Sequence, residues 1–89
     1  TDNIASLRGL NISPNPAKDY TQLNIAFEES VDLTVRIADV TGRVLETRNA
    51  GSTTAEEMRF DVSNITEGVY FMQIIADGQI LTKRFVVVK

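Results

Sequence analysis

The chain has 89 residues, 43% of them hydrophobic, and a formal net charge of −3, which is the size and composition of one folded globular domain. This net negative charge argues against a surface for nucleic acid, which needs clustered Lys and Arg. Cys, His and Trp are absent, so disulfides, the common metal ligands and the usual acid–base residue are missing. We therefore expect a single domain, residues 1–89, with no catalytic residue, metal or cofactor. Because the chain starts at Thr1 rather than Met, we interpret it as a processed product or a piece of something longer.

The first half of the chain carries the alternating pattern of half-buried strands. Leu7, Leu10 and Ile12 supply a first strand, which should end at residues 13–16, Ser-Pro-Asn-Pro, because proline stops ladder pairing. Apolar residues then alternate with polar ones over residues 21–27 and 31–39, which predicts two further strands. The polar link 28–30 is short, so we expect these two strands to form an antiparallel hairpin.

The middle of the chain alternates between turns and short strands. Asp39 and Gly42 have turn chemistry, since Asp accepts from nearby backbone N–H groups and Gly tolerates positive φ. A strand over residues 43–48 follows, and the small, polar residues 49–56 then predict a mobile loop. Alternation at Met58, Phe60 and Val62 predicts another strand, and we expect Ile65 to pack under the connection 63–68.

The last third contains the densest apolar stretch. Asp77-Gly78 suits a two-residue type I′ turn between residues 69–76 and 79–89, so facing residue numbers should sum to 155, as in Tyr70 with Phe85. Both faces of this hairpin would be partly apolar. With about seven short strands and no helix longer than a turn, the sequence predicts an all-β fold, a small antiparallel β-sandwich that is immunoglobulin-like in shape.

Two groups of side chains could carry a binding function, and each has a structural alternative. Glu28, Glu29 and Asp32 lack the ligand spacing of a calcium loop, so we interpret them as a solvated turn. Four aromatic residues could form a sugar-binding platform, although their positions in the strands favour packing. These four are Tyr20, Tyr70, Phe71 and Phe85.

The C-terminal strand is the least ordinary feature of the sequence. It consists of apolar residues framed by basic ones: Lys83, Arg84, Phe85, Val86, Val87, Val88 and Lys89. Basic residues can protect an edge strand against unwanted pairing, or they can be part of a recognised terminus. The physical argument alone leaves both readings open.

Four segments in order resemble a known family. They are residues 13–17 (Ser-Pro-Asn-Pro-Ala), 37–44 (Ile-Ala-Asp-Val-Thr-Gly-Arg-Val), 68–70 (Gly-Val-Tyr) and 83–89. Over residues 10–89 the chain thus resembles the type A C-terminal sorting domain of type IX secretion cargo in the Bacteroidetes. Ser13 departs from the family pattern, which often has Tyr or Phe there.

The resemblance implies a secretion signal that is a substrate and not an enzyme. It implies an N-terminal cargo domain that passes through the periplasm and reaches the cell surface or the medium. The implied partners are the outer-membrane translocon and a sortase-like peptidase that removes the domain and joins the cargo to a lipopolysaccharide. Pairing of exposed edge strands could also give a homodimer.

Two sets of residues follow from the terminal strand and from the resemblance. We expect the recognition surface to comprise Gly68, Tyr70, Lys83, Arg84, Phe85, Val86, Val87, Val88 and Lys89. By resemblance, the turn residues are Pro14, Asn15, Pro16, Asp39, Gly42 and Arg43. The rival interpretation is an accessory fibronectin-like or carbohydrate-binding module of a secreted enzyme.

Overall fold

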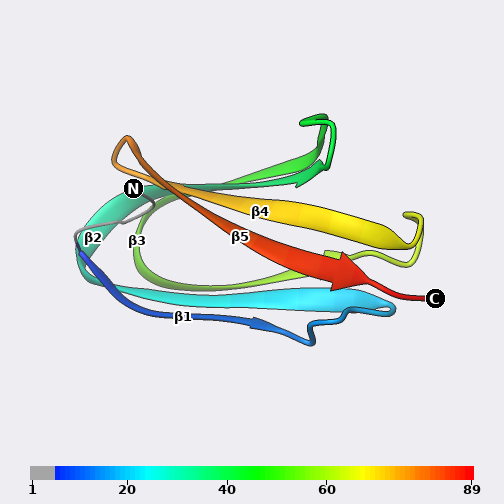
Figure 1. The fold of residues 1–89 in the computed structure, drawn as a ribbon. Helices are drawn as coiled ribbons and strands as arrows, with labels where there is room; N and C mark the ends of the chain where they lie inside the picture. The colour runs from blue at the N-terminus through cyan, green and yellow to red at the C-terminus, as the bar shows by residue number, and fades with distance from the viewer. Residues whose placement is uncertain (1–5) are drawn as a thin grey trace.

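The computed structural model describes residues 6–89, which form five antiparallel strands (Figure 1). The strands are β1 (Leu7–Ser13), β2 (Tyr20–Asp39), β3 (Val44–Asp61), β4 (Gly68–Ala76) and β5 (Gln79–Val87). Their order is β1-β2-β4-β5, with β3 on the other edge of β2. The predicted all-β, antiparallel fold is confirmed. Within residues 6–89, no helix is long and apolar enough to cross a membrane.

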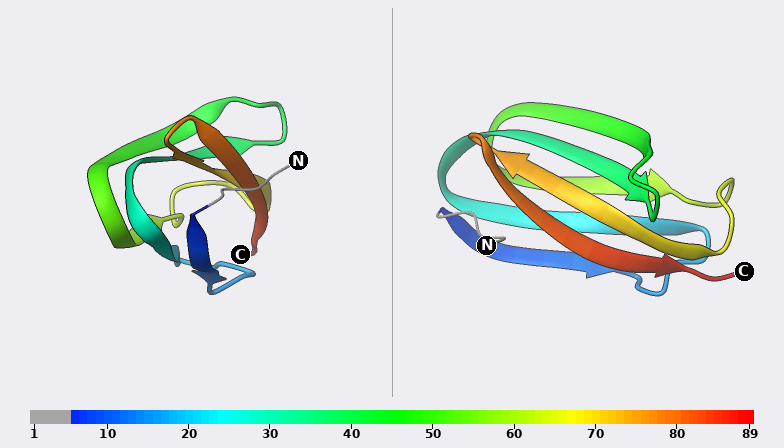
Figure 2. Two further views of the ribbon diagram at one scale, coloured as in Figure 1. Left: turned by 90° about the vertical axis from the view of Figure 1, so that its left-hand side faces the viewer. Right: turned by 45° about the horizontal axis from the view of Figure 1, so that its top comes forward.

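Two long strands bend the sheet onto itself. β2 and β3 pair along nearly their whole length, from Tyr20↔Asp61 to Ala38↔Val44. Between the pairs Ala26↔Ala55 and Val31↔Thr53, β2 has extra residues that β3 does not match. Such a bulge bends a strand and increases its twist, and both strands curve back (Figure 2). The first half of β2 then pairs with β1 and the second half with β4, which gives two facing layers.

The bend explains why the prediction of about seven strands is wrong. Residues 28–30 do not connect a hairpin, because they form the bulge inside β2. Residues 49–56 are not a loop, because β2 offers them backbone partners and they continue β3. The predicted segments therefore merge into two long strands, while the sandwich-like arrangement of two layers is retained.

The C-terminal hairpin is confirmed in its turn and in its register. Asp77 and Gly78 both have positive φ, 49° and 82°, as a type I′ turn requires. Tyr70 faces Phe85 and Ile74 faces Leu81, without any register shift between β4 and β5. Local turn chemistry and alternation are thus sufficient to define this part of the fold.

The core lies between the two layers. Its largest fully buried side chains come from β2, β3, β4 and β5 and from Val62 just after β3. Ile65 packs against them from the 62–67 connection, as predicted. Among them are Leu23, Leu33, Phe60, Met72, Ile74 and Phe85. β1 and β5 are the two ends of the strand order, so closure between them depends on contacts outside the regular ladders.

Candidate recognition surface

The candidate residues of β5 divide into buried and exposed members. Phe85 and Val87 are fully buried in the core, and Val86 is half-buried. Lys83 and Arg84 are exposed, as is Val88 just beyond the strand. A partner that binds the folded domain can therefore reach only some of the residues predicted to be recognised.

The outer edge of β5 is covered at its C-terminal end by the loop between β1 and β2. The side-chain Oδ1 of Asn15 accepts from the backbone N–H of Val86 at 3.1 Å. Ala17 donates to the carbonyl of Val86 at 2.7 Å and accepts from the N–H of Val88 at 2.8 Å. We call residues 14–17 the closing loop, because they join the first and last parts of the described chain.

The closing loop is itself anchored to the core. The Thr21 hydroxyl, which is fully buried, donates to the carbonyl of Pro14 at 3.1 Å. Ala17 is fully buried and forms a parallel bridge with Val87. The bonds that precede Pro14 and Pro16 are both cis. The hydrogen bonds of Asn15 and Ala17, together with the anchoring of Pro14, thus hold the proline-rich segment against the end of β5.

Lys89 is held by backbone groups from two connections. Its Nζ donates to the carbonyls of Val62, Ser63 and Lys18 at 3.0, 3.2 and 3.3 Å. Its backbone N–H donates to Oε1 of Glu67 at 3.1 Å. The ammonium group thereby holds Lys89 against both connections.

Tyr70 and Gly68 shape the start of β4. Tyr70 is 6% exposed, and its ring stacks on that of Phe85 with the centroids 5.9 Å apart. Its hydroxyl donates to the carbonyl of Thr66 at 2.7 Å, which fixes the connection before β4. Gly68 pairs with Val87. Because Tyr70 and Phe85 lie in the core, they cannot offer a ring face to a sugar.

The turn after β2 is organised by one carboxylate. Oδ1 of Asp39 accepts from the Thr41 hydroxyl, the Thr41 N–H and the Arg43 N–H at 2.6, 2.9 and 3.1 Å. Gly42 has a φ of 90°, which a residue with a side chain rarely adopts. The Arg43 side chain is 76% exposed and its Nε lies 3.4 Å from Oδ2 of Asp39. The predicted turn is therefore present, and most of Arg43 remains accessible.

A cavity of about 410 Å³ separates this turn from the connection before β4. The cavity brings together two of the segments that carry the family resemblance. Among its lining residues are Asp39, Arg43, Leu45, Thr66, Glu67 and Gly68. Val40, at the tip of the turn, is 67% exposed beside it.

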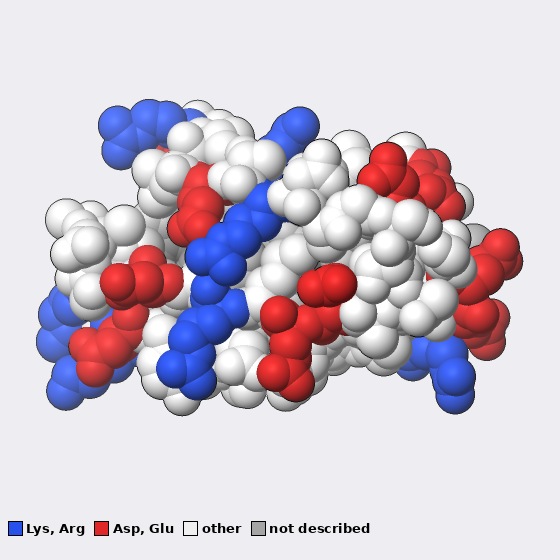
Figure 3. Space-filling model, turned by 180° about the vertical axis from the view of Figure 1, so that it is seen from behind, with Lys and Arg blue, Asp and Glu red and all other residues white. Residues whose placement is uncertain are grey.

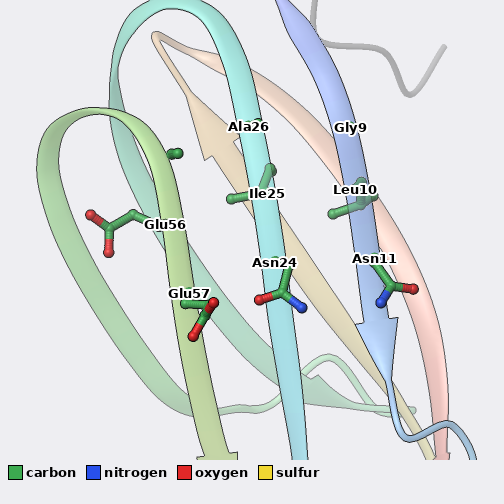
Figure 4. A pocket seen from close by; sticks show the side chains of 9 residues that line it. Gly9, Leu10, Asn11, Asn24, Ile25, Ala26, Glu56 and Glu57 are labelled. Atoms are coloured by element: carbon green, nitrogen blue, oxygen red, sulfur yellow. The ribbon is translucent and has the colours of Figure 1, made fainter.

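A second hollow, of about 570 Å³, lies on β1, β2 and β3. The pairs Asn11↔Asn24 and Asn24↔Glu57 place three polar side chains in a row across these strands (Figure 4). The next row on the same face consists of the small residues Gly9, Ala26 and Ala55, which leave the surface hollowed there. No group of three acidic residues in the described part of the chain could hold a metal ion.

Charge is mixed on the side of the molecule away from the view of Figure 1. Figure 3 shows a diagonal band of basic side chains with acidic side chains on both sides of it. Two arginines cover aromatic rings: Arg48 lies 4.5 Å from the Phe60 ring centroid and Arg59 lies 4.0 Å from that of Tyr20. Because acidic side chains flank the basic band, the face seen in Figure 3 lacks the broad positive field that attracts polyanions.

Asn15, Ala17, Thr21 and Glu67 together hold the C-terminal end of the domain. The sequence indicated Asn15 by resemblance only, and the others were not predicted as site residues. Asn15 and Val86 are 71 residues apart, so no local pattern could have revealed their hydrogen bond. The signals available in the sequence were the resemblance carried by residues 13–17 and the two prolines in that segment.

Replacing Asn15 by Ala should weaken the contact between the closing loop and β5. Loss of the acceptor for the Val86 N–H should reduce the free energy of unfolding by about 1 kcal/mol and speed amide exchange at Val86. Chemical denaturation and exchange measured by NMR test this. Asn11→Ala is the matched control, because the exposed Asn11 side chain donates to the Ser13 hydroxyl, 3.4 Å away in the same strand. Equal effects of the two substitutions would contradict a role for Asn15 in closure.

Acid should weaken the turns that Asp39 and Asp61 organise. Hydrogen bonds from Thr41 lower the pKa of Asp39 below 3.8, and hydrogen bonds from Ser63 do the same for the pKa of Asp61. The folded state then binds fewer protons than the unfolded state in acid. The stabilisation is present above the unfolded pKa and is lost as the pH falls through the folded pKa.

A double variant tests this pH dependence. Between about pH 5 and pH 2, the stability of Asp39→Asn/Asp61→Asn should fall less than that of the unmodified chain. Urea unfolding at a series of pH values measures the difference. Glu28→Gln/Glu29→Gln removes the same number of carboxylates from exposed positions and serves as control. An unchanged slope for the Asp variant would rule out this contribution.

Two comparisons with known proteins agree with this architecture. The family model for the secretion system C-terminal sorting domain matches residues 11–88. Among solved structures, dimeric latent PorU from Porphyromonas gingivalis matches with a TM-score of 0.71 and 20% identity. The match covers 89% of this chain and 9% of that one, so it supports the fold alone. No curated protein matches. With almost its whole length matched by the family model, the chain belongs to the C-terminal sorting domain family of type IX secretion.

Proposed function

We propose that this domain directs an N-terminal cargo protein across the outer membrane and that the export machinery recognises its folded surface. The family match over residues 11–88 carries the proposal, since members of this family are C-terminal sorting signals. The cargo passes through the periplasm and is delivered to the cell surface or the medium. The translocon is the first partner of the domain.

The finer steps of the proposal concern what happens after export. A sortase-like peptidase removes the domain and attaches the cargo to the surface through a lipopolysaccharide. The domain is a substrate in this reaction. The segment before β1 is the region where cleavage would separate cargo from signal, because the closing loop and β5 hold the rest together.

The proposed recognition surface is the exposed part of the set predicted from sequence. Lys83, Arg84 and Val88 face solvent, while Tyr70, Phe85 and Val87 support them from the core. This division favours a folded signal over a linear tag, because the buried residues act by holding the exposed ones in position. The turn at Asp39 and the exposed Arg43 lie beside the start of β4 and extend the surface.

A surface-delivery assay tests this role. A reporter with an N-terminal export signal, fused to the complete domain, should reach the surface of a type IX-competent cell. Lys83→Glu/Arg84→Glu should reduce surface reporter several-fold, because it reverses the charge of the exposed part of β5 without altering the core. Protease accessibility on intact cells measures delivery.

The matched control is Arg8→Glu/Arg36→Glu, which changes the net charge equally at other exposed positions. It should leave delivery near that of the unmodified domain. Delivery of a reporter that lacks the domain altogether would contradict the sorting function. Equal loss with both charge reversals would contradict recognition at β5.

A further inference from the structure

The backbone of β5 has a covered half and an open half along its outer edge. Residues of an antiparallel strand direct their N–H and C=O groups alternately toward one neighbour and the other. The bonds of Val86 to Asn15 and Ala17 place its backbone groups on the side away from β4. The ladder between β4 and β5 has no register shift, so Ile80, Thr82 and Arg84 present their backbone groups on that same side.

No described strand pairs with this open half. β5 ends the strand order, and the hydrogen bonds of the closing loop to the C-terminal segment are made at Val86 and Val88. Ile80 is 50% exposed, and both Lys83 and Arg84 are exposed. Within residues 6–89, the edge from Ile80 to Arg84 therefore offers a short row of backbone groups that an extended segment can reach.

The two basic side chains lie on opposite faces of this edge. Lys83 shares the inner face with Leu81 and Phe85, both of which are buried, and yet it is itself exposed. Arg84 lies on the outer face, opposite Phe71 of β4. A charge on the core-facing side of an edge strand is a recognised way to prevent unwanted strand pairing.

This charge arrangement selects among possible partners. A second copy of the chain would bring another Lys83 and Arg84 to the same edge, and like charges on paired strands repel. A segment with two adjacent acidic residues would instead place one carboxylate on each face, next to Lys83 and Arg84. The protection against self-pairing then becomes an attraction for a strand of opposite charge.

We infer that the edge from Ile80 to Arg84 binds an extended segment with two adjacent acidic residues by strand addition. The segment belongs to the translocon protein that recognises the domain. This assignment of the partner rests on the proposed function. Main-chain hydrogen bonds to Ile80, Thr82 and Arg84 supply affinity, and the two carboxylates supply selectivity. Covering of Val86 and Val88 by the closing loop limits the docked segment to a few residues.

Binding of a synthetic peptide to the complete 89-residue chain tests the inference directly. The probe is a strand peptide of about seven residues, with two adjacent glutamates flanked by valine and threonine. A peptide with two lysines at those positions is the control. The glutamate peptide should shift the NMR signals of the Ile80, Thr82 and Arg84 amides and slow their exchange, and the lysine peptide should not.

Two substitutions at one position separate strand addition from simple charge attraction. Thr82→Pro removes an outward-facing N–H without breaking a bond to β4, and it should weaken peptide binding about tenfold. Thr82→Ala retains the N–H and should bind as the unmodified chain does. If Thr82→Pro does not fold, Lys83→Glu/Arg84→Glu provides the second arm, because it should prefer the lysine peptide.

Several results would overturn the inference. They are equal binding of the two peptides, absence of binding, shifts confined to another surface, and equal affinity of the Pro and Ala variants. Protection of the edge amides by self-association without peptide would mean that a second copy is the occupant. Reporter delivery by the complete domain is independent of all these outcomes, so failure of strand addition leaves the sorting function standing. Failure of the complete domain to deliver a reporter, with peptide binding intact, would contradict the sorting function and leave strand addition standing.

Discussion

The fold depends on the contact between the closing loop and the end of β5. β1 and β5 end the strand order, and no regular ladder joins them. In the contact of the closing loop with β5, the Asn15 side chain accepts from the Val86 N–H, and Ala17 donates to the Val86 carbonyl and accepts from the Val88 N–H. The buried Thr21 hydroxyl donates to the Pro14 carbonyl. Backbone groups at the rim of the core are thereby paired without another strand, and the two layers are joined where the chain leaves the sheet.

The same contact divides the C-terminal strand into a part that the closing loop holds and a part that it leaves uncovered. Toward its end, the strand is buried at Phe85 and Val87, covered at Val86 and followed by Lys89, whose ammonium group binds three backbone carbonyls. From Ile80 to Arg84, no described strand pairs with the outer edge, and the side chains of Lys83 and Arg84 are exposed. The proposed recognition surface is therefore a short accessible edge on a strand that is held by contacts far away in the sequence.

Sequence reasoning succeeded where the determining interactions are local. Asp77-Gly78 defines its hairpin because both residues accept positive φ and the flanking alternation sets the register. It failed at residues 28–30 and 49–56, because a short polar segment suits a hairpin turn and a strand bulge equally well, and only pairing between β2 and β3 decides between them. Lys83 and Arg84, which were expected to form part of a recognition surface, are exposed. The contact of Asn15 with Val86 and the anchoring of Lys89 depend on partners that are remote in sequence.

The central claim is that the signal is a folded surface, and substitution of a distant core residue tests it most directly. Phe60 is fully buried on β3 and is separated in sequence from residues 83–89. Surface delivery of a reporter fused to the Phe60→Asp domain should be lost, although the C-terminal seven residues are unchanged, while Phe60→Leu should retain it. Normal delivery of the Phe60→Asp fusion, with unfolding of the domain verified by circular dichroism, would contradict the account and would mean that the last residues act as a linear tag.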